Sequence, residues 1–217
     1  MGCGIRRDVR RRDHEADPLV GPWLPPDAGP VLTVLAVWLA AAYLVGLAGW
    51  LAAIRPPGPQ VVLVGLTIAL LAATRRWPTL RRFASVVDVR ALVLFHVTRL
   101  VGVYFLALHA RGDLPRAFAL PAGWGDNVVA IGALFLVPLV RPDTPVGRRL
   151  YLAWNVVGLF DILGVVGTAA RLALAEPGSM RALLELPLSL LLTFVVPIII
   201  ATHVLMLVRL MRAAPER

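Results

Sequence analysis

The chain has 217 residues, of which 59% are hydrophobic and 16% are charged. This composition is hard to reconcile with a water-soluble domain, which could not cover itself with so little polar surface, and predicts an all-α, multi-pass membrane protein. The net charge is +9 and all 22 basic residues are arginines, but they are scattered between apolar segments. Because they form no stripe interleaved with aromatic residues, we expect no nucleic-acid partner.

The first 30 residues form a polar, arginine-rich segment that we expect to be a disordered cytoplasmic tail. It contains Cys3, the single cysteine, which excludes a disulfide within one chain. The opening "MGCG" does not match the myristoylation pattern, because Arg6 stands where Ser or Thr is required. An apolar run of full spanning length without a cleavage pattern follows, so we expect it to remain as an anchor.

Apolar runs bounded by charges, Pro and Gly predict six spans within a transmembrane domain at 31–210. They lie at about 31–54, 60–75, 89–110, 126–140, 150–172 and 186–210. Residues 211–217 would then form a short cytoplasmic tail. The second and fourth runs are short for a span, so they either recruit neighbouring residues or are partly broken helices.

The distribution of arginines predicts the orientation of these spans. With the N-terminus inside, cytoplasmic segments carry fifteen arginines and external loops carry five. This excess agrees with the preference of basic residues for the cytoplasmic side and with six spans that leave both termini inside. We therefore expect a multi-pass membrane protein, with the lipid bilayer as its surroundings.

Two opposite charges lie where a membrane helix should be apolar. Arg99 and Asp161 each fall within about 2 Å of the centre of their spans. Either charge alone would cost about 2.5 to 3.5 kcal/mol there, so we expect the third and fifth spans to be neighbours and the two side chains to pair. Gly158 and Gly164 flank Asp161 at three residues on either side, a spacing that favours close helix approach or room for a small solute.

Three further polar side chains fall at one level, on the cytoplasmic side of this pair. They are His96, Asn155 and His203, each on a different predicted span. His96 and Arg99 are three residues apart and share a helix face, so the layer and the charge pair can line one intramembrane polar pocket. The alternative is purely structural, because such groups also hydrogen-bond neighbouring helices together.

The segment between the third and fourth spans reads "HARGDLPRAFALPAGWGDN". Its polar and interfacial residues suit a lid or a short re-entrant piece at the outer surface, with an ordinary interfacial loop as the alternative. We single out His109, Asp113, Arg116, Trp124 and Asp126 as its candidate residues.

Four stretches carry a resemblance to a known family: "RLVGVYFL", "LPRAFALPAGWGD", "WNVVGLFDIL" and "LPLSLLLTFVVPIIIATHVLML". Across residues 90–210 the chain resembles a family of small, uncharacterised bacterial multi-pass membrane proteins of the actinobacterial type. The resemblance implies an inner-membrane location and carries no activity, because no function is established for that family.

Three functions follow from these patterns. The first is a channel, carrier or receptor whose pocket binds a small anionic solute or relays protons. The second is a structural or assembly subunit in which the polar layer only specifies helix pairing. The third is a b-type haem protein with His96 and His203 as axial ligands, although we expect no cofactor. Phosphate-binding loops and hydrolase or metalloprotease motifs are missing, so we do not expect an enzyme, and the oligomeric state stays open.

Overall fold

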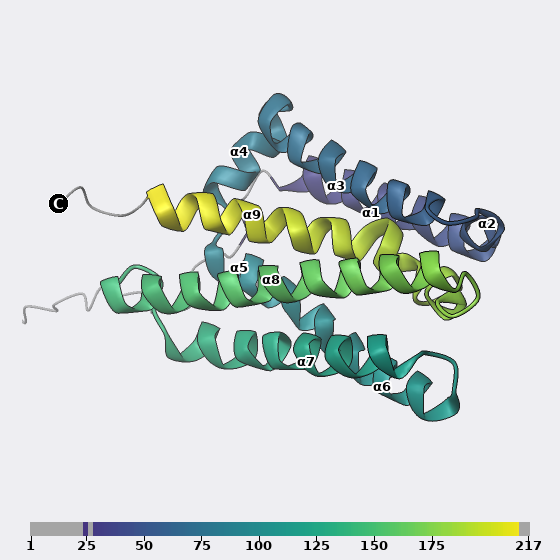
Figure 1. The fold of residues 1–217 in the computed structure, drawn as a ribbon. Helices are drawn as coiled ribbons and strands as arrows, with labels where there is room; N and C mark the ends of the chain where they lie inside the picture. Colours follow the sequence, from purple (N-terminus) through teal and green to yellow (C-terminus); the bar gives the residue numbers. More distant parts are fainter. Residues whose placement is uncertain (1–23, 26–27, 213–217) are drawn as a thin grey trace, which may run out of the picture.

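The computed structural model describes residues 24–25 and 28–212. Within them, six helical segments are long and apolar enough to cross a membrane (Figure 1). They are α1 (Gly29–Leu47), α3 (Gly58–Arg76), α5 to α6 (Val89–Arg111), α7 (Arg116–Leu139), α8 (Pro145–Ala175) and η3 with α9 (Leu191–Arg212). The prediction of an all-α, six-span bundle is confirmed. The predicted N-terminal tail, including Cys3, falls largely outside the described residues.

The first span is shorter than expected because the chain turns at Gly49. This residue has φ +66°, a left-handed conformation that favours glycine, and the short helix α2 (Trp50–Ala53) follows it. The second span is longer than its apolar run: it recruits Gly58 and Pro59, and proline is well suited to the first turn of a helix. Between the second and third spans lies the short helix α4 (Pro78–Val86).

The fourth span differs most from the expectation. Helix α7 is 24 residues long and runs continuously through Pro121, Gly123 and Gly125, so the predicted external loop shrinks to residues 112–115. The expectation of a lid or re-entrant piece was therefore wrong. Pro and Gly end helices in water, but a membrane helix packed between neighbours tolerates them. Gly123 is buried in this packing.

The third and sixth spans are helical throughout but not uniformly α-helical. In the third, α5 (Val89–Phe95) and α6 (Gly102–Arg111) are joined by the tighter 3₁₀ segment η1 (His96–Val101). The sixth begins with the wider π-helical turn η3 (Leu191–Val195) before α9 (Val196–Arg212). Such departures from α geometry often occur at functional sites.

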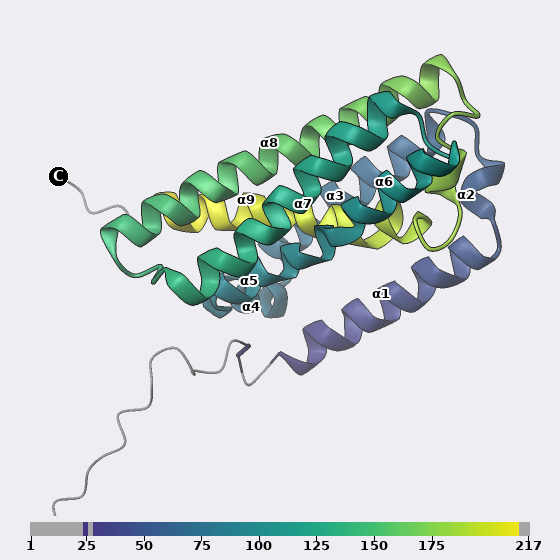
Figure 2. The same ribbon diagram turned by 90° about the horizontal axis from the view of Figure 1, so that it is seen from below.

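Helix α7 packs against α6 and α8, while α9 packs against α8 and α3. Helix α1 lies at the margin of this arrangement (Figure 2), where Trp38 meets Phe194 at a ring-centroid distance of 5.1 Å. Few α1 residues are buried. Spans three to six therefore form most of the buried core, and the predicted polar residues lie on these spans.

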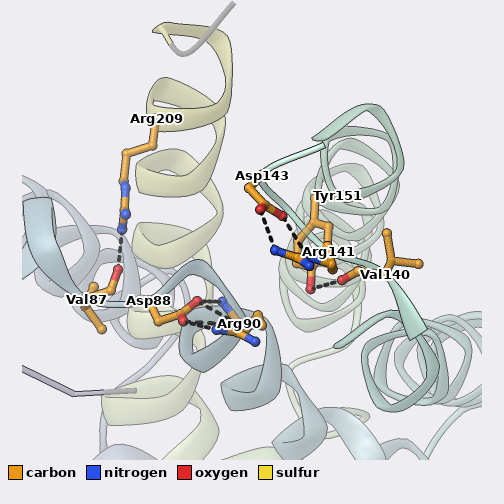
Figure 3. A network of polar contacts seen from close by, with 8 residues as sticks. All are labelled: Val87, Asp88, Arg90, Val140, Arg141, Asp143, Tyr151 and Arg209. Carbon is orange, nitrogen blue, oxygen red and sulfur yellow. Dashed lines mark hydrogen bonds and ion pairs between the residues drawn. The ribbon is translucent and has the colours of Figure 1, made fainter. Parts of the chain in front are cut away.

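Polar contacts join the ends of the helices at the α4 end of the bundle (Figure 3). Asp88 caps α5 by accepting from the backbone N–H of Arg90 at 2.8 Å, and its carboxylate also pairs with the Arg90 guanidinium at 2.9 Å. Arg209 of α9 donates to the Val87 carbonyl at 2.7 Å. These contacts satisfy backbone groups at the junction of α4 and α5 and hold it against α9.

A second group of contacts in Figure 3 lies at the junction of α7 and α8. The Tyr151 hydroxyl donates to the Val140 carbonyl at 3.3 Å, just beyond the end of α7. Nearby, the Arg141 guanidinium pairs with Asp143 at 3.0 Å, and its hydrogen bonds lower the pKa of that exposed carboxyl group. Asp143 is thus an aspartate ionised at neutral pH, which makes it a useful control for the buried ones.

The described residues carry ten arginines at the α4 end of the bundle, five at the α2 end and Arg99 between them. The ten are Arg75, Arg76, Arg81, Arg82, Arg90, Arg141, Arg148, Arg149, Arg209 and Arg212, and the five are Arg55, Arg111, Arg116, Arg171 and Arg181. This asymmetry predicts that the α4 end faces the cytoplasm.

Single cysteines in a Cys3→Ser background test this orientation. We expect a membrane-impermeant maleimide to label Asp113→Cys, at the α2 end, in intact cells. Asp143→Cys, at the α4 end, should be labelled only after the cells are permeabilised. Both positions are exposed in the bundle, so accessibility across the membrane is the main difference between them. The opposite labelling pattern would invert the predicted topology.

Candidate functional site

Arg99 lies at the centre of the bundle with only 1% of its side chain exposed. Its Nε donates to Asp126 Oδ1 at 2.6 Å, and its Nη1 donates to the Gly158 carbonyl at 3.0 Å. Its Nη2 pairs with Asp161. One guanidinium thus joins η1 to α7 and to α8, through charge-assisted hydrogen bonds of the strong kind.

The structure brings Arg99 and Asp161 together as the depth argument proposed, and it adds a second carboxylate. Asp126 was placed in the external loop, whereas it belongs to α7 and its side chain is 5% exposed. The site therefore holds one guanidinium between two carboxyl groups. We call Arg99, Asp126 and Asp161 the charge cluster.

We call His96 and His203 the histidine layer, and the 3₁₀ conformation of η1 aligns the charge cluster with it. A 3₁₀ helix has about three residues per turn, so side chains three positions apart lie directly above one another. His96 and Arg99 have this spacing and both are buried. The sequence predicted a shared face, and the tighter winding brings the two side chains into closer register than an α-helix would.

Two glycines allow the helices to approach closely at this level. A Cβ added to Gly125 of α7 would collide with the Asp161 carboxylate, so the absence of a side chain there admits that carboxylate. A Cβ at Gly158 of α8 would lie 2.7 Å from His203 Cε1. Gly158 also accepts from Arg99, so it separates the charge cluster from the histidines by a single backbone unit.

The predicted polar layer is present as a connected group. Asn155 donates from Nδ2 to the His203 carbonyl at 3.1 Å, which identifies its Oδ1 as the acceptor 2.9 Å from His203 Nδ1. Thr202 gives its hydroxyl proton to a backbone carbonyl at 2.9 Å and can only accept from His96 Nε2, 3.2 Å away. These contacts assign the protons of both neutral rings, leaving a lone pair on His96 Nδ1 and on His203 Nε2.

Among the residues that the structure describes, neither of these two nitrogens has a hydrogen-bond partner, although both atoms are buried. The ring centroids of His96 and His203 are 4.1 Å apart, and Trp154 lies against both rings. Two imidazoles on opposite sides of a haem iron need metal–nitrogen bonds of about 2 Å, which places the centroids about 6 Å apart. The rings as they stand do not fit a bis-histidine haem.

The residues predicted for the external loop do not form a site together. His109, near the end of α6, contacts the Leu114 carbonyl at 3.1 Å, while Asp113 and Arg116 are exposed near the turn. Trp124 lies on α7 and is 63% exposed on the outside of the bundle. Only Asp126 reaches the charge cluster.

Sequence reasoning missed the role of Asp126 because the surrounding "PAGWGDN" looked like a loop. The sequence nevertheless contained a pattern that could have identified this role. Asp126 is an acid within reach of an apolar run, next to two glycines, and in a membrane that pattern indicates close packing against a charged partner.

Comparison with known sequences matches residues 56–211 to a domain of unknown function, DUF8737. The matched region begins after α1 and α2 and contains the whole charge cluster and histidine layer. No curated protein and no solved structure matches the chain.

Replacing Arg99 should destabilise the protein strongly. Arg99→Gln leaves two buried carboxyl groups without their cation, a type of change that costs about 3 to 5 kcal/mol of unfolding free energy. The triple variant Arg99→Gln, Asp126→Asn, Asp161→Asn carries no charge at this level and should recover much of that loss. Unfolding of the purified protein in mixed micelles measures both, with Asp143→Asn as the control. A triple variant as unstable as Arg99→Gln would contradict the assigned contacts.

Gly158→Ala should cost about 1 to 3 kcal/mol, because the new methyl group must displace His203 or push the helices apart. Gly164→Ala on the same helix is the matched control, since a Cβ there meets nothing within 4 Å. It should leave the stability unchanged or raise it by about 1 kcal/mol at most. Equal effects of the two substitutions on thermal unfolding would show that Gly158 is not a close-contact position.

Proposed function

Because the chain belongs to the DUF8737 family, whose description gives no activity, we propose a function from the site alone. We propose that this multi-pass membrane protein binds and exchanges a proton at the charge cluster. The observation that carries the proposal is the ratio of charges, with two carboxylates around one guanidinium.

The charge cluster has one net negative charge when both aspartates are ionised. An uncompensated charge buried in a membrane protein is costly, and ionisable groups in such places commonly neutralise. Arginine does not give up its proton, so neutrality is reached when one carboxyl group takes a proton. The arrangement thus favours one bound proton and holds it next to a fixed cation.

Asp161 is the member of the cluster best placed for exchange. Its side chain is 23% exposed, against 5% for Asp126. It also lines a hollow of ≈ 200 Å³ between α7 and α8, whose wall includes Phe118, Phe160 and Thr168. We propose that the proton enters and leaves the charge cluster through this hollow.

The same ratio of charges argues against an anionic solute. The Arg99 guanidinium already donates to two carboxylates and a backbone carbonyl. An entering anion would meet a region that is negative or neutral, without spare positive charge. We therefore propose that the charge cluster binds a proton and not an anion.

Infrared spectroscopy of protein with isotope-labelled aspartate tests the proposal by counting the protonated aspartic acids in each chain. At neutral pH the wild type should show one protonated aspartic acid per chain. Asp126→Asn and Asp161→Asn should each show none, because one carboxylate then balances Arg99. Arg99→Gln, where it remains folded, should show two.

Asp143→Asn is the matched control, and it should keep the wild-type band because that carboxyl group is exposed and ionised. Transfer to heavy water should shift the wild-type band, since Asp161 faces the hollow. A wild type without an acid band would overturn proton binding. A band that never shifts would identify a static structural proton, which would favour the structural or assembly role instead.

A further inference from the structure

The junction between α3 and α4 gathers exposed arginines at the end of the second span. Arg75 and Arg76 are the last two residues of α3, and Arg81 follows one turn into α4. Trp77 joins the two helices, and its carbonyl accepts from the Arg81 backbone N–H at 2.9 Å. All three arginines are exposed. We call Arg75, Arg76 and Arg81 the arginine corner, where α4 turns sharply away from the end of α3 (Figure 1).

Helix α4 is amphipathic and presents its arginines on the side away from the bundle. Its exposed residues recur at the spacing of one helix face and are Pro78, Arg81, Arg82, Ser85 and Val86. On the opposite side Ala84 is buried, and Phe83 packs against the core cluster that contains Val87. A helix of nine residues is about 13 Å long and too short to cross a bilayer. Helix α4 therefore lies at the level of the membrane surface, where the span formed by α3 ends.

The positive charge of the arginine corner is not balanced by the described part of the chain. The sequence contains no Asp or Glu from residue 28 to residue 87. The next acid, Asp88, pairs with Arg90 at 2.9 Å. Within the described residues, no member of the arginine corner forms an ion pair. Arg209 brings a further guanidinium to the end of α4, where it donates to the Val87 carbonyl.

An apolar surface of α3 continues from the arginine corner toward the middle of the membrane. Val61, Val64 and Ile68 are exposed and lie on one face of the helix. Arg75 follows Ile68 by seven residues, so it lies on the same face about 10 Å further along. A lipid whose acyl chains lie against these residues would have its phosphate at the level of the arginine corner. Trp77 suits this level as well, because tryptophan prefers the head-group region.

We infer that the arginine corner binds the phosphate of an anionic phospholipid, in the leaflet at the α4 end of the bundle. A guanidinium matches a phosphate group with two parallel N–H donors. The uncompensated charge of the corner favours a lipid with a net negative charge over a zwitterionic one. The apolar face of α3 favours a lipid over a soluble anion. The inference goes beyond proton binding and does not depend on it.

Native mass spectrometry of the purified protein, titrated with two phospholipids of identical acyl chains, tests the inference. Each basic residue near a membrane surface favours anionic lipid about fivefold. The wild type should therefore bind phosphatidylglycerol about tenfold to a hundredfold more tightly than phosphatidylcholine. The triple variant Arg75→Gln, Arg76→Gln, Arg81→Gln should lose this preference and bind phosphatidylcholine as the wild type does. Equal affinity of the wild type for the two lipids would overturn the inference.

The matched control removes the same charge from exposed positions at the α2 end and is Arg111→Gln, Arg116→Gln, Arg171→Gln. It should keep the preference for phosphatidylglycerol. Lysine at all three positions of the arginine corner should keep most of it, which separates loss of charge from a change in fold. Glycerol 1-phosphate, which lacks acyl chains, should not displace the lipid at equal concentration. Displacement would assign the corner to a soluble anion, and a preference that survives the glutamine variant of the corner would overturn the site.

Discussion

The bundle depends on the neutralisation of Arg99. A guanidinium at this depth is tolerable only if its donors and its charge are satisfied by the protein, and the structure does so with groups from two other helices. These partners of Arg99 restrict how α7 and α8 can be oriented. Asp126 fixes the rotation of α7, and the Gly158 carbonyl together with Asp161 fixes the rotation and height of α8. In lipid, where apolar contacts between helices compete with equally apolar tails, such polar contacts specify which helix faces are buried.

Local backbone geometry also brings these polar groups close together. The 3₁₀ winding of η1 stacks His96 over Arg99, and the missing side chains at Gly125 and Gly158 let a carboxylate and an imidazole come close to neighbouring helices. The histidine layer is then held by Asn155 and Thr202, whose contacts assign one proton to each ring. The charge cluster and the histidine layer meet at Gly158, whose carbonyl accepts from Arg99 and whose Cα lies against His203.

Much of this could be predicted from sequence. Spanning length, arginine asymmetry and depth arithmetic located six helices, and they placed Arg99 opposite Asp161 because both lie midway between flanking arginines. The boundaries of α7 could not be predicted, because Pro121, Gly123 and Gly125 carry the same local signal in a loop as in a tightly packed membrane helix. Asp126 was misplaced for that reason. The apolar pocket beside Arg99 could not be predicted either, because its aliphatic wall residues look like any other lipid-facing or core residues until the helices are assembled.

The two carboxyl groups of the charge cluster differ in their surroundings. Asp161 is 23% exposed and lines the hollow between α7 and α8, whereas the Asp126 side chain is 5% exposed. Under the proposed function, the proton is exchanged at Asp161, while Asp126 stays paired with Arg99 and keeps α7 in place. Loss of that proton would leave one net negative charge in the bundle, which the single guanidinium cannot balance, so the cluster would return to the protonated state.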